Sequence, residues 1–127
     1  MKVVDSSGWL EFFTDGPLAE AYAEHLADLD QILTPALVIY EVYKKIKRER
    51  SEEEALIAVA QLEKTRVVPC TTSVVLTAVD LSLEHRLAMA DSIIYATAIL
   101  HQAEVVTSDD DFDGLPGVTY LEKPSSA

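Results

Sequence analysis

The stretch EVVTSD, residues 104–109, is a short β-branched run that ends on a carboxylate, and KVVD, residues 2–5, repeats this pattern. Both runs have the Val-rich composition of strands that are buried on both faces of a parallel sheet. In such a sheet the carboxyl ends of neighbouring strands meet at one edge, where ligands bind. Asp5 and Asp109 are therefore expected to lie close together, although they are far apart in the sequence.

Short β-rich runs alternate with longer helical patterns along the whole chain. The predicted strands are 2–5, 31–34, 66–69, 104–107 and 118–121, and the predicted helices are 8–13, 18–29, 36–50, 52–64, 73–85 and 91–102. This alternation predicts an α/β fold in which helices cover both faces of a parallel sheet. Ser6 or Ser7 is expected to cap the first helix, Pro17 to occupy the first turn of the second, and Ser51 to cap the fourth.

Four acidic residues lie next to apolar segments: Asp5, Glu41, Asp91 and Asp109. A carboxylate beside a core is costly unless something compensates it. If the four converge, each close pair repels by about 4 kcal/mol at an effective dielectric constant near 20. A hard divalent cation relieves this repulsion, and Mg²⁺ or Mn²⁺ prefers such oxygen ligands. Two of these acids also have an ordinary interpretation: Asp5 as a turn or cap residue, and Asp109 as part of a solvated acidic loop.

Glu41 lies in the predicted helix 36–50, beside basic side chains. The apolar stripe expected to face the core is Ala36, Ile39, Tyr40, Tyr43 and Ile46, and Glu41 borders it. The basic row that follows is Lys44, Lys45 and Arg48. Glu41 is interpreted either as half of a surface Glu–Lys pair worth a few tenths of a kcal/mol, or as a metal ligand beside a basic track for phosphates.

Asp91 is the most informative single position. It is the only charged residue between positions 87 and 100, a segment that is apolar almost all round and is therefore expected to be buried. Asp91 could cap this helix, but Ile94 occupies the place where a capping box needs Glu or Gln. The small residues Ala90, Ala96 and Ala98 would let the helix approach the sheet and bring Asp91 to the strand ends.

Composition limits the class of protein. The 127 residues suffice for one domain, and their net charge of −12 argues against a general nucleic-acid binder, whose affinity would depend on Lys and Arg. The charge does not exclude an enzyme, because bound cations reverse the local charge where a phosphate docks. With a single cysteine, Cys70, and no run apolar enough to span a membrane, we expect a soluble, cytoplasmic protein.

The chain resembles the PIN-domain nucleases, and most closely the VapC-like ribonuclease toxins of toxin–antitoxin pairs. The resemblance covers nearly the full length and rests on VDSS at residues 4–7, Glu41 after the Thr-Pro pair at residues 34–35, ADSIIYATA at residues 90–98, and VTSDDDF at residues 106–112. It implies a three-layer α/β/α fold with a central, mostly parallel sheet of four to five strands. Residues 1–122 would form the nuclease domain and 123–127 a flexible tail.

The resemblance also implies a function and a site. Asp5, Glu41, Asp91 and Asp109 would hold one or two Mg²⁺ or Mn²⁺ ions, with Glu41 acting directly or through water. Ser6, Thr107 and Asp111 would be auxiliary, and the run of three aspartates leaves open whether Asp109 or Asp111 is the principal fourth acid. The protein would hydrolyse RNA, with Lys44, Lys45 and Arg48 contacting it. The implied partners are a VapB-like antitoxin and a second copy of the chain.

Other classes fit the residues less well. A phosphoacceptor receiver-like domain needs adjacent acids after its first strand, but Ser6 follows Asp5 here. A phosphatase of the Asp-x-Asp type needs an acid at the position of Ser7. The alternative that stays open is a catalytically inactive acidic α/β module that docks a basic partner.

Overall fold

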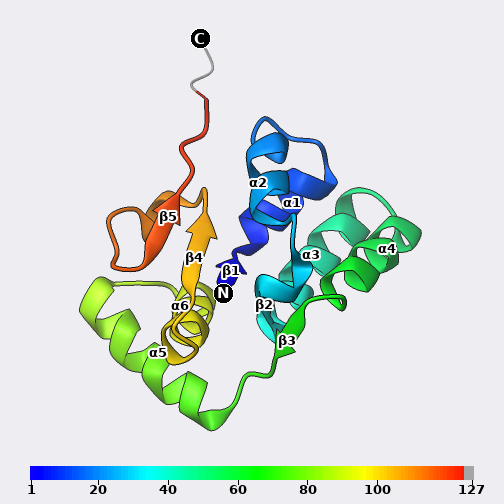
Figure 1. Cartoon of the computed structure of the whole chain (residues 1–127). Helices are drawn as coiled ribbons and strands as arrows, with labels where there is room; N and C mark the ends of the chain where they lie inside the picture. Colours follow the sequence, from blue (N-terminus) through cyan, green and yellow to red (C-terminus); the bar gives the residue numbers. More distant parts are fainter. Residues whose placement is uncertain (125–127) are drawn as a thin grey trace.

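The computed structural model describes residues 1–124 and contains a five-stranded sheet in the order β3-β2-β1-β4-β5, in which every neighbouring pair is parallel. The strands are β1 (Lys2–Val4), β2 (Ile32–Pro35), β3 (Arg66–Val68), β4 (Glu104–Thr107) and β5 (Val118–Tyr120) (Figure 1). The predicted α/β class and parallel sheet are therefore confirmed, with five strands and no antiparallel one in the described part of the chain.

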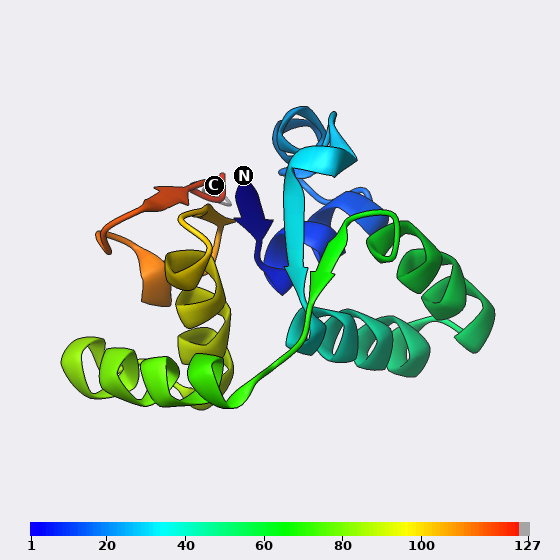
Figure 2. The ribbon, with the colours of Figure 1, turned by 60° about the horizontal axis from the view of Figure 1, so that its bottom comes forward.

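Six α-helices connect the strands: α1 (Ser6–Phe13), α2 (Ala19–His25), α3 (Ala36–Glu49), α4 (Glu52–Leu62), α5 (Thr72–His85) and α6 (Met89–Leu100). Right-handed crossovers place the helices of the first two connections on one face of the sheet and α5 and α6 on the other. Figure 2 shows α5 and α6 together on the left and α3 and α4 on the right. The architecture is the expected three-layer α/β/α arrangement.

The core is centred on β1 and β4, which lie between other strands. Val3, Val4, Val105 and Val106 are fully buried, as expected for Val-rich strands covered on both faces. The edge strand β3 is different, since Arg66 and Val67 are exposed. Burial of each of the four valines contributes about 1.5–3 kcal/mol to folding.

Several predicted boundaries were wrong by a few residues. Pro17 does not lie in a helix, because it precedes α2 in a turn, and the predicted helix 18–29 is split into α2 and a 3₁₀ turn, η1 (Leu29–Gln31). Ser51 does cap α4, since its Oγ accepts a 3.1 Å hydrogen bond from the backbone N–H of Glu54. Of the expected flexible tail, residues 125–127 lie outside the described residues. Within residues 1–124 no helix is both long and apolar enough to cross a membrane.

Candidate metal centre

Asp5 follows the central strand β1 and is almost fully buried, with 2% of its surface exposed. Its backbone N–H donates to the carbonyl of Val106, which continues the pairing of β1 with β4. Its carboxylate Oδ2 accepts hydrogen bonds from Thr107 Oγ1 at 2.7 Å and Ser7 Oγ at 2.9 Å. Burial raises the pKa of the Asp5 carboxyl above its ordinary value, although these hydrogen bonds oppose the shift.

Ser6 and Ser7 support Asp5 instead of capping α1. The hydroxyl of Ser6 lies 3.3 Å from Asp5 Oδ1, and the N-cap position of α1 is Asp5 itself, which makes no side-chain capping bond. The prediction of a serine cap was therefore wrong. The physical reason is that the buried carboxylate competes for the same hydroxyls and has the greater need of donors.

Asp109 and Asp111 lie in the loop after β4. The backbone N–H of Asp109 donates to Thr107 Oγ1 at 2.9 Å, and Asp109 Oδ1 accepts from the N–H of Asp111 at 3.0 Å. Asp109 thereby caps the 3₁₀ turn η2 (Asp110–Phe112). Asp109 is half-buried and Asp111 is exposed, so the solvated-loop interpretation fits Asp111 better than Asp109.

Asp91 lies in the first turn of α6 and faces these loop carboxylates. One oxygen from each of Asp91, Asp109 and Asp111 lies within 4.8 Å of the others. Burial raises the pKa of Asp91 to about 7, with further contributions from the negative charges of Asp109, Asp5, Asp111 and Glu41. Helix α6 begins at Met89, two residues earlier than predicted, so Asp91 is not the residue that caps it.

Glu41 approaches the same cluster from α3. Its Oε1 is buried and has no hydrogen-bond partner among the described residues. Burial raises the pKa of Glu41, and the charges of Asp5 and Asp109 raise it further. The apolar stripe predicted for this helix is confirmed only in part: Ile46 is buried and Ile39 and Tyr43 pack against the core, whereas Ala36 and Tyr40 are exposed. The most deeply buried residues of the helix are Val38, Val42 and Ile46, and the prediction missed the two valines.

The four acids expected from the sequence therefore approach one another at the carboxyl edge of the sheet, and Asp111 joins them. The group is not uniform: Asp91, Asp109 and Asp111 form a tight triad, whereas Asp5 and Glu41 interact with it through their charges. Oxygens bound to one Mg²⁺ are about 3 to 4.2 Å apart, so the side chains of the triad would rotate toward one another to share an ion. The unpartnered Glu41 Oε1 and the all-oxygen donor set also fit a hard cation.

Two clefts adjoin the acids. The first, of about 270 Å³, lies along α3 and is lined by Ser6, Leu10, Tyr40, Glu41, Lys44, Lys45 and Arg48. The basic row and Glu41 therefore share one hollow. Lys45 and Arg48 also lie 3.7 and 3.6 Å from Glu49, in exposed ion pairs that water screens strongly.

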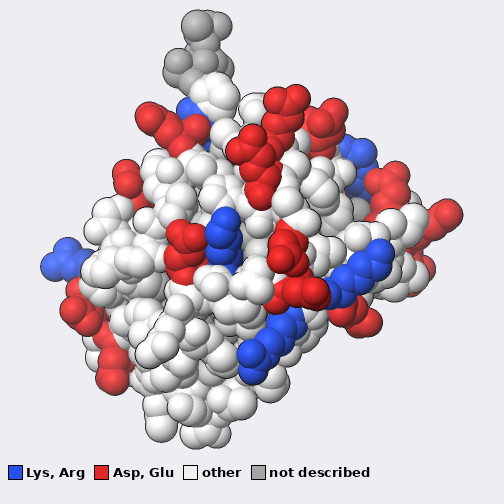
Figure 3. All heavy atoms as spheres, viewed as in Figure 1, with Lys and Arg blue, Asp and Glu red and all other residues white. Residues whose placement is uncertain are grey.

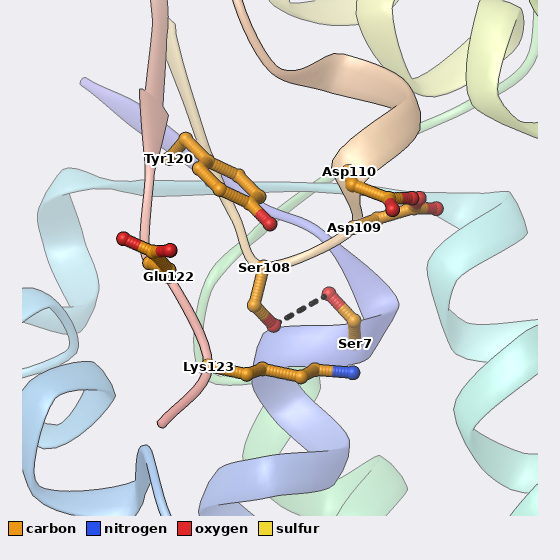
Figure 4. Close-up of a pocket in the computed structure, with 7 residues that line it drawn as sticks. All are labelled: Ser7, Ser108, Asp109, Asp110, Tyr120, Glu122 and Lys123. Carbon is orange, nitrogen blue, oxygen red and sulfur yellow. Dashed lines mark hydrogen bonds between the residues drawn. The ribbon is translucent and has the colours of Figure 1, made fainter. Parts of the chain in front are cut away.

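The second cleft, of about 520 Å³, lies between the β4 loop and the segment after β5. It is lined by Ser7, Ser108, Asp109, Asp110, Tyr120, Glu122 and Lys123 (Figure 4). Sequence reasoning did not find Tyr120 or Lys123. The signal that was available is the position of Tyr120, which ends β5 at the same edge where Asp5 and Asp109 follow β1 and β4.

Comparisons with known proteins agree with this arrangement. The family model of the PIN domain matches residues 2–118. A search among curated proteins found no match. Among solved structures, the fold is similar to a chain of a toxin–antitoxin complex from Klebsiella pneumoniae, with a TM-score of 0.83, 26% identity, and coverage of 98% of this chain and 100% of that one.

Two further structures are similar in fold at lower identity. The sarcin-ricin loop cleaving toxin VapC20 of Mycobacterium tuberculosis has a TM-score of 0.75 and 18% identity, over 98% of this chain and 100% of that one. FitAcB of Neisseria gonorrhoeae has a TM-score of 0.71 and 19% identity, over 95% of this chain and 97% of that one.

Proposed function

This chain belongs to the PIN-domain family, and from that premise we propose that it is a metal-dependent endoribonuclease that acts as the toxin of a toxin–antitoxin pair. The observation that carries the proposal is the convergence of carboxylates from four separate segments: Asp91 on α6, Asp109 and Asp111 after β4, Asp5 after β1 and Glu41 on α3. The similarity to VapC20, described as cleaving the sarcin-ricin loop, supports RNA as the substrate class.

In this proposal the acids bind the metal and the hydroxyls fix their geometry. Asp91, Asp109 and Asp111 would hold Mg²⁺ or Mn²⁺, with Asp5 as a further ligand and Glu41 acting directly or through water. When bound, one or two such ions would neutralise the scissile phosphate and lower the pKa of a water molecule. Thr107 and Ser6 would hold Asp5 in place by their hydrogen bonds.

No side chain is needed as a nucleophile. The buried, unpartnered Oε1 of Glu41 is available to orient a water by accepting its hydrogen bond. Because water and not the ribose 2′-hydroxyl attacks, the expected products carry a 5′-phosphate and a 3′-hydroxyl. Lys44, Lys45 and Arg48 would contact flanking phosphates in the cleft that they share with Glu41.

The direct test is cleavage of a defined pool of single-stranded RNAs by purified protein in EDTA, Mg²⁺ and Mn²⁺, with the ends of the products determined. Metal binding is measured separately by calorimetry and by the rise in thermal stability that a bound ion produces. Cleavage with either ion, and none in EDTA, supports the proposal. Metal-independent cleavage, or none under any condition, would contradict it. The second result would favour the inactive acidic module that docks a basic partner.

An antitoxin is the proposed protein partner, because the Klebsiella pneumoniae structure is described as a toxin–antitoxin complex. A basic side chain of such a protein would form ion pairs with the clustered carboxylates. The proposed docking surface is the pair α3 and α4, beside a hollow of about 230 Å³ that Leu10 and Ile46 help to line. Leu56 and Ile57 are exposed on α4. Co-expression with a cognate VapB-like antitoxin should give a complex without nuclease activity.

A second copy of the chain is the proposed partner for the face formed by α5 and α6, on the other side of the sheet from α3 and α4. Leu76, Val79, Leu83 and Met89 are at least half exposed on α5 and α6. In Figure 3 the surface over these helices, in the lower part of the view, is largely without charged side chains. Contiguous apolar surface of this kind marks interaction sites. Light scattering should detect a dimer that Leu83→Asp dissociates.

A cytoplasmic location stays a prediction.

A further inference from the structure

The larger cleft adjoins the acids on the side away from α3. Asp109 belongs both to the acid triad and to the wall of this cleft, so a molecule in the cleft would lie directly beside the triad. Figure 4 shows the hydroxyl of Tyr120 directed toward Asp109 and Asp110, and Lys123 extended across the opposite side toward Ser7. The volume of this cleft, about 520 Å³, is in the range of sites that bind small organic groups.

Strand pairing fixes Tyr120 in this position. Tyr120 is the partner of Thr107 in the parallel register of β4 and β5, and the N–H of Leu121 donates a 2.7 Å hydrogen bond to the carbonyl of Thr107. Thr107 is also the residue whose hydroxyl contacts both Asp5 and Asp109. The aromatic ring therefore lies on β5 directly beside Thr107, the β4 residue that positions the acids.

The charges in the cleft favour a nucleobase over a bare phosphate. Three carboxylates, from Asp109, Asp110 and Glu122, line the cleft, and Lys123 is the only basic residue among the described residues that line it. Carboxylates repel phosphate but accept hydrogen bonds from the N–H groups of bases. Aromatic side chains stack on unpaired bases in most single-strand binding sites. Lys123 can contact the phosphate attached to such a nucleotide.

The two clefts lie on either side of Asp5. Ser6 lines the basic cleft and Ser7 lines the larger one, and both hydroxyls contact the Asp5 carboxylate. A strand of RNA that follows Lys44, Lys45 and Arg48 to the acids would leave them through the larger cleft. The basic cleft would then contact the backbone, and the larger cleft would contact a base.

We propose that the larger cleft is a nucleotide subsite, in which Tyr120 stacks on the base next to the scissile bond and Lys123 contacts the phosphate of that nucleotide. The proposal rests on the proposed ribonuclease function and adds a group that discriminates between RNA sequences, since a base held there can donate to Asp110 or Glu122. Tyr120 is thus assigned a role in binding and specificity, separate from metal binding.

The test uses fluorescein-labelled single-stranded RNA decamers of random sequence. Their binding is measured in Ca²⁺, with the RNA checked for integrity, and their cleavage is measured in Mn²⁺. Tyr120→Leu removes the aromatic face, and Tyr120→Phe keeps it as the matched control. Lys123→Glu is compared with Lys64→Glu, an equal charge change on an exposed lysine that lines neither cleft. Circular dichroism and metal binding verify that each variant is folded with an intact acid cluster.

We expect Tyr120→Leu to weaken RNA binding and lower kcat/KM on the order of 10-fold, and Tyr120→Phe to change either by less than about 2-fold. Sequencing of the products should show a weaker preference at one nucleotide beside the cut in Tyr120→Leu.

If wild type cleaves RNA and Tyr120→Leu matches it in affinity, rate and preference, the subsite is refuted while the ribonuclease function stands. Loss of binding in Tyr120→Leu, with no cleavage by wild type, would refute the nuclease function and leave the RNA-binding subsite. Neither binding nor cleavage by wild type would overturn both.

Discussion

The hydroxyl of Thr107 donates a 2.7 Å hydrogen bond to the carboxylate of Asp5, joining two residues that are 102 positions apart in the sequence. The same oxygen accepts the backbone N–H of Asp109 at 2.9 Å. One side chain on β4 therefore sets the separation between the acid that follows β1 and the acid that follows β4. The acids act as a metal site only if this separation is maintained.

Thr107→Val should weaken Mn²⁺ binding by about 10-fold, because the isosteric valine can neither donate to Asp5 nor accept from Asp109. Calorimetry measures the affinity. The matched control is Thr119→Val on β5, which also removes a threonine–carboxylate hydrogen bond, that of Thr119 to Glu104 at 2.6 Å. Equal affinities for the two variants would mean that Thr107 has only a structural role.

Asp91→Asn should abolish metal binding and RNA cleavage while leaving the metal-free fold as stable or more stable. Burial and the neighbouring acids disfavour the charge of Asp91, and asparagine removes that charge at nearly constant shape. At pH 8 without metal we expect a gain on the order of 1 kcal/mol in the free energy of unfolding, measured with urea. Asp80→Asn, on the exposed surface of α5, should change neither property. Full activity in Asp91→Asn would remove Asp91 from the site.

The stability of the metal-free protein should fall as the pH rises from about 4 to 7. The pKa of Asp91 is raised from 3.8 to about 7, so within this window the folded protein keeps a proton that the unfolded chain has released. Stability then decreases with rising pH by on the order of 1–2 kcal/mol, once solvent screening of this half-buried group is allowed for. Urea titrations at several pH values measure the slope, which should be shallower in Asp91→Asn. A slope of opposite sign would show that the acids are not mutually destabilised.

Reversing the charges of Lys44, Lys45 and Arg48 to glutamate should raise KM for RNA several-fold and leave kcat nearly unchanged. These side chains share a cleft with Glu41 but do not belong to the acid cluster. Because contacts with phosphates depend on released counterions, the effect should shrink as salt increases. Lys64→Glu serves again as the control, with a charge change equal to that of each single reversal. An unchanged KM at low salt would assign the row to an ordinary solvated helix face.

Gly8→Ala should destabilise the fold by about 1–3 kcal/mol, because a methyl group there would collide with the ring of Tyr22 and lie 2.7 Å from Val4 Cγ1. The comparison is Gly16→Ala, where the new methyl meets only the movable carboxylate end of Glu11 and the cost should be smaller. Thermal unfolding of both variants provides the measurement. Similar stabilities would show that α1 shifts easily on the sheet.

The acids were predictable from the sequence because they interrupt apolar runs, and strand ends in a parallel sheet share one edge. Local competition for hydrogen bonds was not predictable. Ser6 and Ser7 have the residue type and position of helix caps, yet a carboxylate buried by tertiary packing attracts their hydroxyls. The stripe of α3 was predicted only in part: Ile46 is buried and Tyr43 packs against the core, but Tyr40 is exposed and its hydroxyl lies 3.4 Å from Lys44.

The second cleft was missed because no periodic pattern marks it. It is formed by Ser7, the β4 loop and the segment after β5, and only the register of β4 and β5 brings these together. Asp111 was predicted as auxiliary, and its oxygen lies in the triad beside those of Asp91 and Asp109.

The sheet order has a consequence for the time at which the acid cluster can assemble during protein synthesis. Translation produces β1 first, but its neighbour β4 comes from the last quarter of the chain, after α6. A nascent polypeptide that stops short of residue 104 carries Asp5, Glu41 and Asp91 without the strand that gathers them. An unfinished polypeptide therefore lacks the assembled acid cluster, which can form only after β4 has been synthesised.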